Sequence, residues 1–111
     1  MGITKSDLFT PAQNQLASIA KVLAHPARLA ILQHLVTSKS CINTDLVQEL
    51  GLAQPTISQH LRELKEAGLI QGSIDGTRLN YCINPERWQE IANGFQDFFQ
   101  TYWNTETKSC C

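Results

Sequence analysis

The hydrophobic and polar positions between residues 46 and 70 follow the pattern of two consecutive helices joined by a short turn. Gly51 stands between them, where the chain needs a left-handed cap. The second helix runs from about Gln54 to Ala67, and its apolar residues recur at the i, i+4, i+7 spacing of one buried face. The apolar positions are Leu46, Val47 and Leu50 in the first helix and Ile57, Leu61 and Leu64 in the second. This arrangement predicts a helix-turn-helix that binds DNA.

The other side of the second helix is polar, and its side chains are able to hydrogen-bond phosphates or base edges. The residues that we expect to contact DNA are Gln54, Thr56, Ser58, Gln59, His60 and Arg62. We expect His60, like His25 and His34, to be a structural or DNA-side residue rather than a metal ligand, because no two of these histidines have the spacing of metal ligands. The alternative for the whole segment is an ordinary helical hairpin with a solvated polar face.

A β-hairpin is predicted directly after the second helix. The β-rich runs 69–74 and 77–83 flank Asp75-Gly76, a dipeptide typical of hairpin turns. A hairpin at this place corresponds to the wing of a winged helix. Arg78 follows the turn, and we expect it either to contact a phosphate or the minor groove or to be solvated.

The two ends of the chain predict further helices. Thr10-Pro11-Ala12-Gln13 has the residues of a helix start, with Thr10 as N-cap and Gln13 completing a capping box. Asn84-Pro85 opens a helix through Trp103 with apolar residues at helical spacing. They are Trp88, Ile91, Ala92, Phe95, Phe98, Phe99 and Tyr102. This aromatic area exceeds what a small monomer needs on one helix, which favours a packing surface; the alternative is a small-molecule pocket.

The segment from Ala24 to Leu32 (AHPARLAIL), the helix-turn-helix and the Asp-Gly wing together resemble the ArsR/SmtB family of small winged-helix repressors. Members of that family sense metals, metalloids or reactive sulfur. The resemblance covers about residues 11–103. It implies a mainly α fold with a small β-hairpin (α+β), in which the first and last helices pair across a twofold axis. It also implies a homodimeric repressor that binds a palindromic DNA operator.

Accordingly, we divide the chain into an N-terminal extension (1–10), a winged helix-turn-helix domain (11–104) and a tail with two cysteines (105–111). With 111 residues and 42% hydrophobic content, the chain can bury one core. No apolar run is long enough to span a bilayer and the start lacks a signal peptide, so we expect a cytoplasmic protein without a membrane partner.

Composition also limits the function. The formal net charge of -1 opposes tight nonspecific binding to DNA, so we expect salt-sensitive binding of moderate strength. A winged helix that binds only protein is the alternative that this charge favours. An enzyme is not expected, because the sequence has no phosphate-cradling glycine loop, nucleophile elbow or evident pair of spaced carboxylates.

Ligand sensing is predicted at the cysteines. Zinc-sensing members of the resembled family use carboxylate and histidine residues of the last helix; this helix, from Glu86 to Trp103, has no histidine, so we expect no zinc site there. Arsenite- and cadmium-sensing members carry a Cys-x-Cys pair close to Cys41, but here Ile42 and Thr44 take its place and Cys41 is offset by one residue. Cys110 and Cys111 supply two further soft ligands. Three thiolates suit As(III), Sb(III) or a soft metal ion such as Cd(II) or Cu(I).

Our hypothesis is that Cys110 and Cys111, together with Cys41, bind such an ion and thereby lower the affinity for DNA. Sensing of oxidants or persulfides through thiols is one alternative. In the other, no cysteine senses anything: Cys41 and Cys82 are small buried hydrophobic residues and the tail pair is idle.

Overall fold

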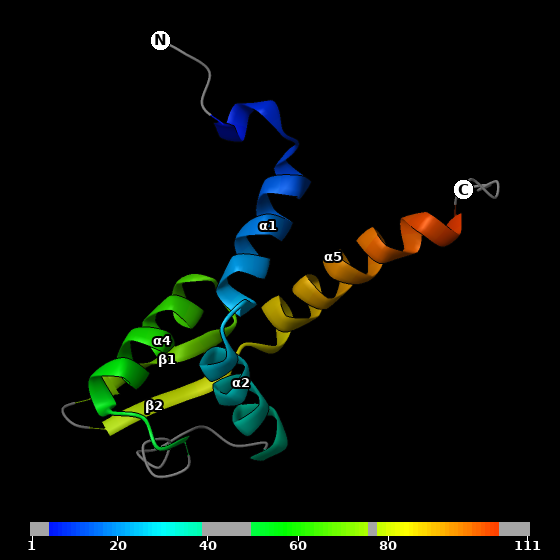
Figure 1. The fold of residues 1–111 in the computed structure, drawn as a ribbon. Helices are drawn as coiled ribbons and strands as arrows, with labels where there is room; N and C mark the ends of the chain where they lie inside the picture. The colour runs from blue at the N-terminus through cyan, green and yellow to red at the C-terminus, as the bar shows by residue number, and fades with distance from the viewer. Residues whose placement is uncertain (1–4, 39–49, 76–77, 105–111) are drawn as a thin grey trace.

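The computed structural model describes residues 5–38, 50–75 and 78–104 (Figure 1). The described elements are a short 3-10 helix (Lys5–Leu8), α1 (Pro11–Leu23), α2 (Pro26–Ser38), α4 (Gln54–Glu66), β1 (Ile70–Asp75), β2 (Arg78–Ile83) and α5 (Pro85–Asn104). Helices α2 and α4 and the hairpin form one body, from which α1 and α5 project on the same side (Figure 1). The predicted first helix of the helix-turn-helix lies outside the described residues, except for Leu50.

Helix α1 begins at the predicted residue, and the capping box is confirmed. The Thr10 hydroxyl accepts a hydrogen bond from the Gln13 backbone N–H at 3.1 Å, and the Gln13 side-chain oxygen accepts one from the Thr10 N–H at 2.9 Å. Two N–H groups that the first helical turn leaves without partners are thereby satisfied. The entry angle of α1 is fixed by these local bonds.

Helix α4 buries the predicted face completely. Ile57, Leu61 and Leu64 are 0% exposed. They belong to one core cluster with Ile31, Leu32 and Leu35 of α2 and with Leu69, Ile70 and Tyr81 in and beside the hairpin. Burial of each such side chain stabilises the fold by about 1.5–3 kcal/mol. The rotation of α4 about its axis is therefore fixed, and the opposite face points outward.

The end of α4 is a Schellman turn. Gly68 has a φ of +84°, its N–H donates to the Lys65 carbonyl at 2.9 Å, and the N–H of Leu69 donates to the Leu64 carbonyl at 3.1 Å. Gly51, before α4, also has a positive φ, of +70°, as the sequence predicted. The chain passes from Gly68 directly into the hairpin.

Strands β1 and β2 pair antiparallel, from Ile70 opposite Ile83 to Asp75 opposite Arg78. The predicted hairpin is confirmed. Its boundary differs by one residue, because Asp75 is the last paired residue of β1 rather than part of the turn.

The far half of α5 projects from the body. Near its start, Trp88 and Ile91 are half-buried against the core. Further along, Phe98, Phe99, Tyr102 and Trp103 are 57%, 65%, 59% and 73% exposed. The aromatic stripe is therefore covered at only one end within a single chain. No helix in the described part of the chain is long and apolar enough to cross a membrane.

Gly72 has a φ of +145° and lies opposite Tyr81 in the hairpin. A Cβ at this position would collide with the Asn80 carbonyl oxygen and approach the Tyr81 Cα to 2.9 Å. Because the strands cannot separate without losing their ladder, Gly72→Ala should lower the free energy of unfolding by about 1–3 kcal/mol. Urea unfolding monitored by circular dichroism measures this change. The neighbouring exposed Ser73→Ala is the control, and an equal loss in both variants would contradict the steric explanation.

Candidate nucleic-acid interface

The outward face of α4 carries most of the residues that the sequence assigned to DNA contact. Gln54, Thr56, Gln59 and Arg62 are exposed, and Ser58 is half-buried. Since the opposite face is locked into the core, these side chains project together from one rigid helix. The backbone of Arg78 lies in β2, whereas its side chain is outside the described part of the structure.

Two of the exposed residues, Gln59 and Arg62, are linked by side-chain hydrogen bonds to each other and to the half-buried Glu63. Arg62 Nη1 donates to Gln59 Oε1 at 3.0 Å, and Gln59 Nε2 donates to Glu63 Oε1 at 3.1 Å. This network assigns the orientation of the Gln59 amide. Glutamine can bond adenine, and arginine can bond guanine, in a bidentate manner in the major groove. The hydrogen bonds thus hold side by side two groups whose chemistry would allow them to contact bases.

The N-terminus of α4 offers backbone donors. Ala53 is the N-cap and no side-chain hydrogen bond caps the helix there, while Pro55 occupies the first turn. N–H groups at an uncapped helix start are suited to bonding a phosphate oxygen. This contribution is relevant because α4 carries few positive charges: its cationic residues are Arg62 and Lys65, and it also carries Glu63 and Glu66.

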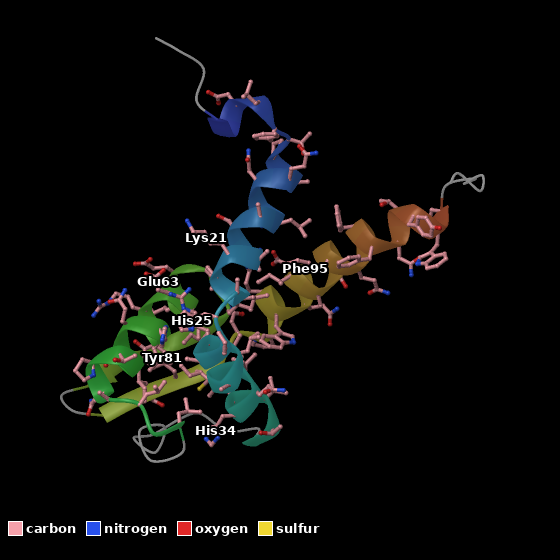
Figure 2. All side chains as sticks on the ribbon, viewed as in Figure 1. Lys21, His25, His34, Glu63, Tyr81 and Phe95 are labelled. Carbon is pink, nitrogen blue, oxygen red and sulfur yellow. The ribbon has the colours of Figure 1, made fainter. Side chains whose placement is uncertain are left out.

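His60, although it belongs to α4, does not lie on the outward face. It is 7% exposed, and its Nδ1 accepts a hydrogen bond from Arg28 Nε at 3.2 Å. Its ring meets the ring of His25 edge-on, with the centroids 4.4 Å apart. His25 lies at the junction of α1 and α2 beside α4 (Figure 2). The structure therefore gives His60 the structural role that the sequence left as the alternative to DNA contact.

Arg28 connects three helices. It lies on α2, it bonds His60 of α4, and its Nη1 donates to the Val22 carbonyl at the end of α1 at 3.3 Å. Sequence reasoning did not assign this role, although Arg28 lies in the segment that carries the family resemblance.

The surroundings of His60 disfavour its protonation. Burial lowers the pKa of His60 from its ordinary value, and the charges of His25 and Arg28 lower it further, whereas Glu63 acts in the opposite direction. A neutral imidazole is also what the geometry requires, because Nδ1 must keep a lone pair to accept from Arg28.

A second arginine that sequence reasoning missed contacts the other end of α4. Arg87 of α5 donates from Nε to the Ala67 carbonyl at 3.4 Å and from Nη1 to Glu90 Oε2 at 3.3 Å. With the Gln15 amide oxygen turned toward it, Arg87 also donates to Gln15 on α1 from Nη1 at 3.0 Å and from Nη2 at 3.1 Å. Arg87 therefore links α1, α4 and α5.

The candidate metal ligands Cys41, Cys110 and Cys111 lie outside the described residues. Cys82 of β2 is half-buried and disulfide-bonded, which corrects the expectation of a small buried thiol. No pattern in the sequence indicated that bond. Among the described residues, no group of three or more His, Cys, Asp or Glu side chains is arranged to hold a metal ion.

The sequence profile described as "Bacterial regulatory protein, arsR family" matches residues 25–71. A biofilm growth-associated repressor of Xylella fastidiosa is 29% identical over 99 residues, covering 89% of this chain and 85% of the relative. An uncharacterized HTH-type transcriptional regulator of Methanocaldococcus jannaschii is 40% identical over 75 residues, covering 68% of this chain and 84% of the relative.

Solved structures show the same architecture. The crystal structure of an ArsR family transcriptional regulator aligns with a TM-score of 0.69 and 25% identity, over 86% of this chain and 96% of that one. A homodimeric winged helix-turn-helix domain from Mycobacterium bovis aligns with a TM-score of 0.60 and 22% identity, over 100% and 99% of the chains. The fold is thus a winged helix-turn-helix, as predicted.

These likenesses define the class of the protein as a DNA-binding transcriptional regulator and not an enzyme. The chain belongs to the arsR family of bacterial regulatory proteins, which confirms the resemblance seen in the sequence.

The lowered pKa of His60 makes stability depend on pH. As pH falls below about 6.5, His60 binds a proton in the unfolded chain before it does so in the folded chain, so the free energy of unfolding should decrease. Urea unfolding of the wild type between pH 7.5 and 5.5, at fixed protein concentration, should show a steeper decrease than the His60→Gln variant. An equal pH dependence in the two proteins would refute the assignment.

A second variant separates proton binding from hydrogen bonding. Gln keeps an acceptor for Arg28, whereas His60→Ala removes it and should cost about 1–3 kcal/mol even at pH 7.5.

Proposed function

We propose that the protein is a homodimeric repressor that inserts α4 into successive major grooves of a palindromic operator. The observation that carries this proposal is the division of α4 into a fully buried apolar face and an exposed polar face within a winged helix. The proposed base or phosphate contacts are Gln54, Thr56, Ser58, Gln59 and Arg62, with Arg78 from the wing. Such a regulator acts in the compartment that holds the chromosome, so we place it in the cytoplasm.

The dimer is supported by the uncovered surface of α1 and α5. A groove of about 580 Å³ runs between them, lined mainly by apolar side chains that include Leu16, Phe95, Phe98 and Phe99. A second copy of the same surface would bury the exposed aromatic rings, and the similar fold from Mycobacterium bovis is homodimeric. A twofold axis would then place two α4 helices about one DNA turn apart, roughly 34 Å.

In this proposal the affinity for DNA comes from a few hydrogen-bond donors at defined positions rather than from a high net positive charge. The net charge is -1, so phosphate neutralisation contributes less than in a basic protein. Binding should therefore weaken as salt rises, but from a moderate starting affinity.

Gln59→Ala tests how α4 contacts the operator. If Gln59 bonds a base, its removal should cost about 1–3 kcal/mol at one operator position and little at the others. Fluorescence anisotropy with the DNA upstream of the gene and single-base variants measures this pattern. Gln89→Ala is the matched control, since Gln89 is an exposed glutamine on α5 whose side chain donates a hydrogen bond to Asn93 at 2.9 Å.

A uniform loss across sequences would make Gln59 a phosphate contact instead. No specific binding of the wild type at moderate salt would contradict the repressor and favour the protein-interaction alternative.

For the inducer, we propose a soft metalloid such as As(III) or Sb(III), held by Cys110 and Cys111 together with Cys41. The support is chemical, because three thiolates match the preference of these ions. Binding of the ion would lower the affinity for DNA because the cysteine site is coupled to α1 and α5, the helices proposed to form the dimer.

A thiol-redox regulator is the second candidate, and the Cys82 disulfide favours it. The chain has four cysteines, and a disulfide uses two of them. The two that are left are fewer than the three thiols of the metalloid site. The two candidates therefore require different oxidation states of the same protein, which makes them separable.

The double variant Cys110→Ser/Cys111→Ser should abolish arsenite-triggered release of the reduced protein from its operator, because two of the three proposed ligands are lost. Anisotropy with stoichiometric arsenite measures release, and Cys82→Ser is the control that should still respond. Unchanged release from the double variant would end the metalloid hypothesis. Release by a thiol oxidant that requires Cys82 would establish the redox alternative.

A further inference from the structure

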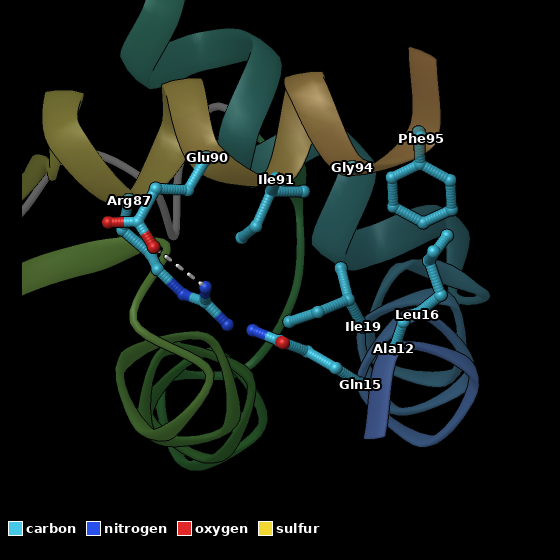
Figure 3. Close-up of a pocket in the computed structure, with 9 residues that line it drawn as sticks. All are labelled: Ala12, Gln15, Leu16, Ile19, Arg87, Glu90, Ile91, Gly94 and Phe95. Carbon is cyan, nitrogen blue, oxygen red and sulfur yellow. Dashed lines mark hydrogen bonds and ion pairs between the residues drawn. The ribbon is translucent and has the colours of Figure 1, made fainter. Parts of the chain in front are cut away.

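A cleft of about 220 Å³ lies between α1 and α5, on the side that faces α4 (Figure 3). Its walls are mostly apolar, with Leu16 and Ile19 from α1 and Ile91 and Phe95 from α5. Ala12 and Gly94 leave space between the helices, and a Cβ at Gly94 would meet nothing within 4 Å. The volume and the apolar walls suit a small apolar body; for comparison, an enclosed cavity of about 150 Å³ lined by Leu, Ile and Phe binds benzene.

The polar end of the cleft is formed by Arg87, Glu90 and Gln15 (Figure 3). The Arg87–Glu90 ion pair is a single contact at 3.3 Å, and the Glu90 side chain is 67% exposed, so water screens the pair and makes it weak. Arg87 itself is 23% exposed. Its guanidinium is thus a partly buried cation whose present acidic partner is weakly held.

We propose that this cleft binds a small organic acid with an apolar body. The carboxylate accepts a bidentate pair of hydrogen bonds from Arg87, whose planar fork matches it, and displaces Glu90 into solvent. The carboxylate also replaces the Gln15 oxygen as acceptor for Nη1 and Nη2 of Arg87, and the Gln15 amide turns over so that its nitrogen donates to the same carboxylate. The apolar body lies against Leu16, Ile19, Ile91 and Phe95.

Binding of the acid would also affect the position of α4, because Arg87 contacts the end of that helix. The side chain donates to the Ala67 carbonyl at the end of α4, and its stem packs over Gly68, where an added Cβ would come within 3.0 Å of Arg87 Cγ. A carboxylate that draws the guanidinium toward the cleft weakens the bonds to Ala67 and Gln15 together. This regulatory consequence rests on the proposed repressor function, whereas binding of the acid does not.

The test measures binding to the full-length protein without DNA, by titration calorimetry with phenylacetate, 4-methylpentanoate and the neutral analogue phenylacetamide. Both acids should bind saturably, with one site per chain, and the amide should bind at least about tenfold more weakly. Arg87→Gln should weaken binding of the acids at least about tenfold, while Glu90→Gln, which removes the competing carboxylate, should strengthen it. Lys21→Gln removes an exposed cation on α1 outside the cleft and should change nothing.

Ala12→Leu fills the cleft while leaving Arg87 in place, and it should abolish binding in a protein whose circular dichroism is unchanged. Failure of both acids to bind at millimolar concentration, equal binding of acid and amide, or binding that is indifferent to Arg87→Gln would each overturn the proposal. Binding to the operator is measured separately by anisotropy. If the protein bound the acids but showed no specific binding to DNA, the cleft proposal would stand and the proposed repressor function would be refuted.

Discussion

Helix α4 is held at two points by guanidinium groups from other helices. Arg28 of α2 donates to His60 in the middle of α4, and Arg87 of α5 donates to the Ala67 carbonyl at its end. Each arginine also bonds α1, at the Val22 carbonyl and at the Gln15 amide. Because arginine carries five donors in a rigid fork, one side chain can connect three helices. The position of the helix proposed to contact DNA therefore depends on the helices proposed to carry the dimer.

The hydrophobic core and the two arginines constrain α4 in different ways. Burial of Ile57, Leu61 and Leu64 is strong but non-directional, so it determines which face of α4 points inward. Hydrogen bonds are directional, and they determine where α4 sits along that core. The bonds from Arg28 and Arg87 are 3.2 and 3.4 Å long, and a typical net contribution is about 0.5–1.5 kcal/mol each. A change at either arginine can thus shift α4 without unfolding the domain.

Local patterns in the sequence predicted the fold well. The capping box at Thr10, the buried stripe of α4 and the hairpin each depend on residues a few positions apart. The arginine contacts join residues 32 and 20 positions apart, which no periodicity reveals. The burial of His60 could have been predicted from the sequence. His60 lies three residues after Ile57 and next to Leu61, so helical spacing places it beside the buried stripe.

Helix α5 lines both the cleft proposed to bind an acid and the groove proposed to form the dimer, so the two sites are coupled. The Arg87 cleft and the aromatic groove share the side chains or backbone of Ala12, Leu16, Gly94 and Phe95. An occupant of the cleft would touch Leu16 and Phe95, which also line the groove where we propose that a second copy packs. Packed interfaces shift between discrete arrangements rather than deforming smoothly. Coupling between two binding sites is reciprocal. If the proposed acid lowers the affinity for the proposed operator by some factor, the bound operator must lower the affinity for the acid by the same factor.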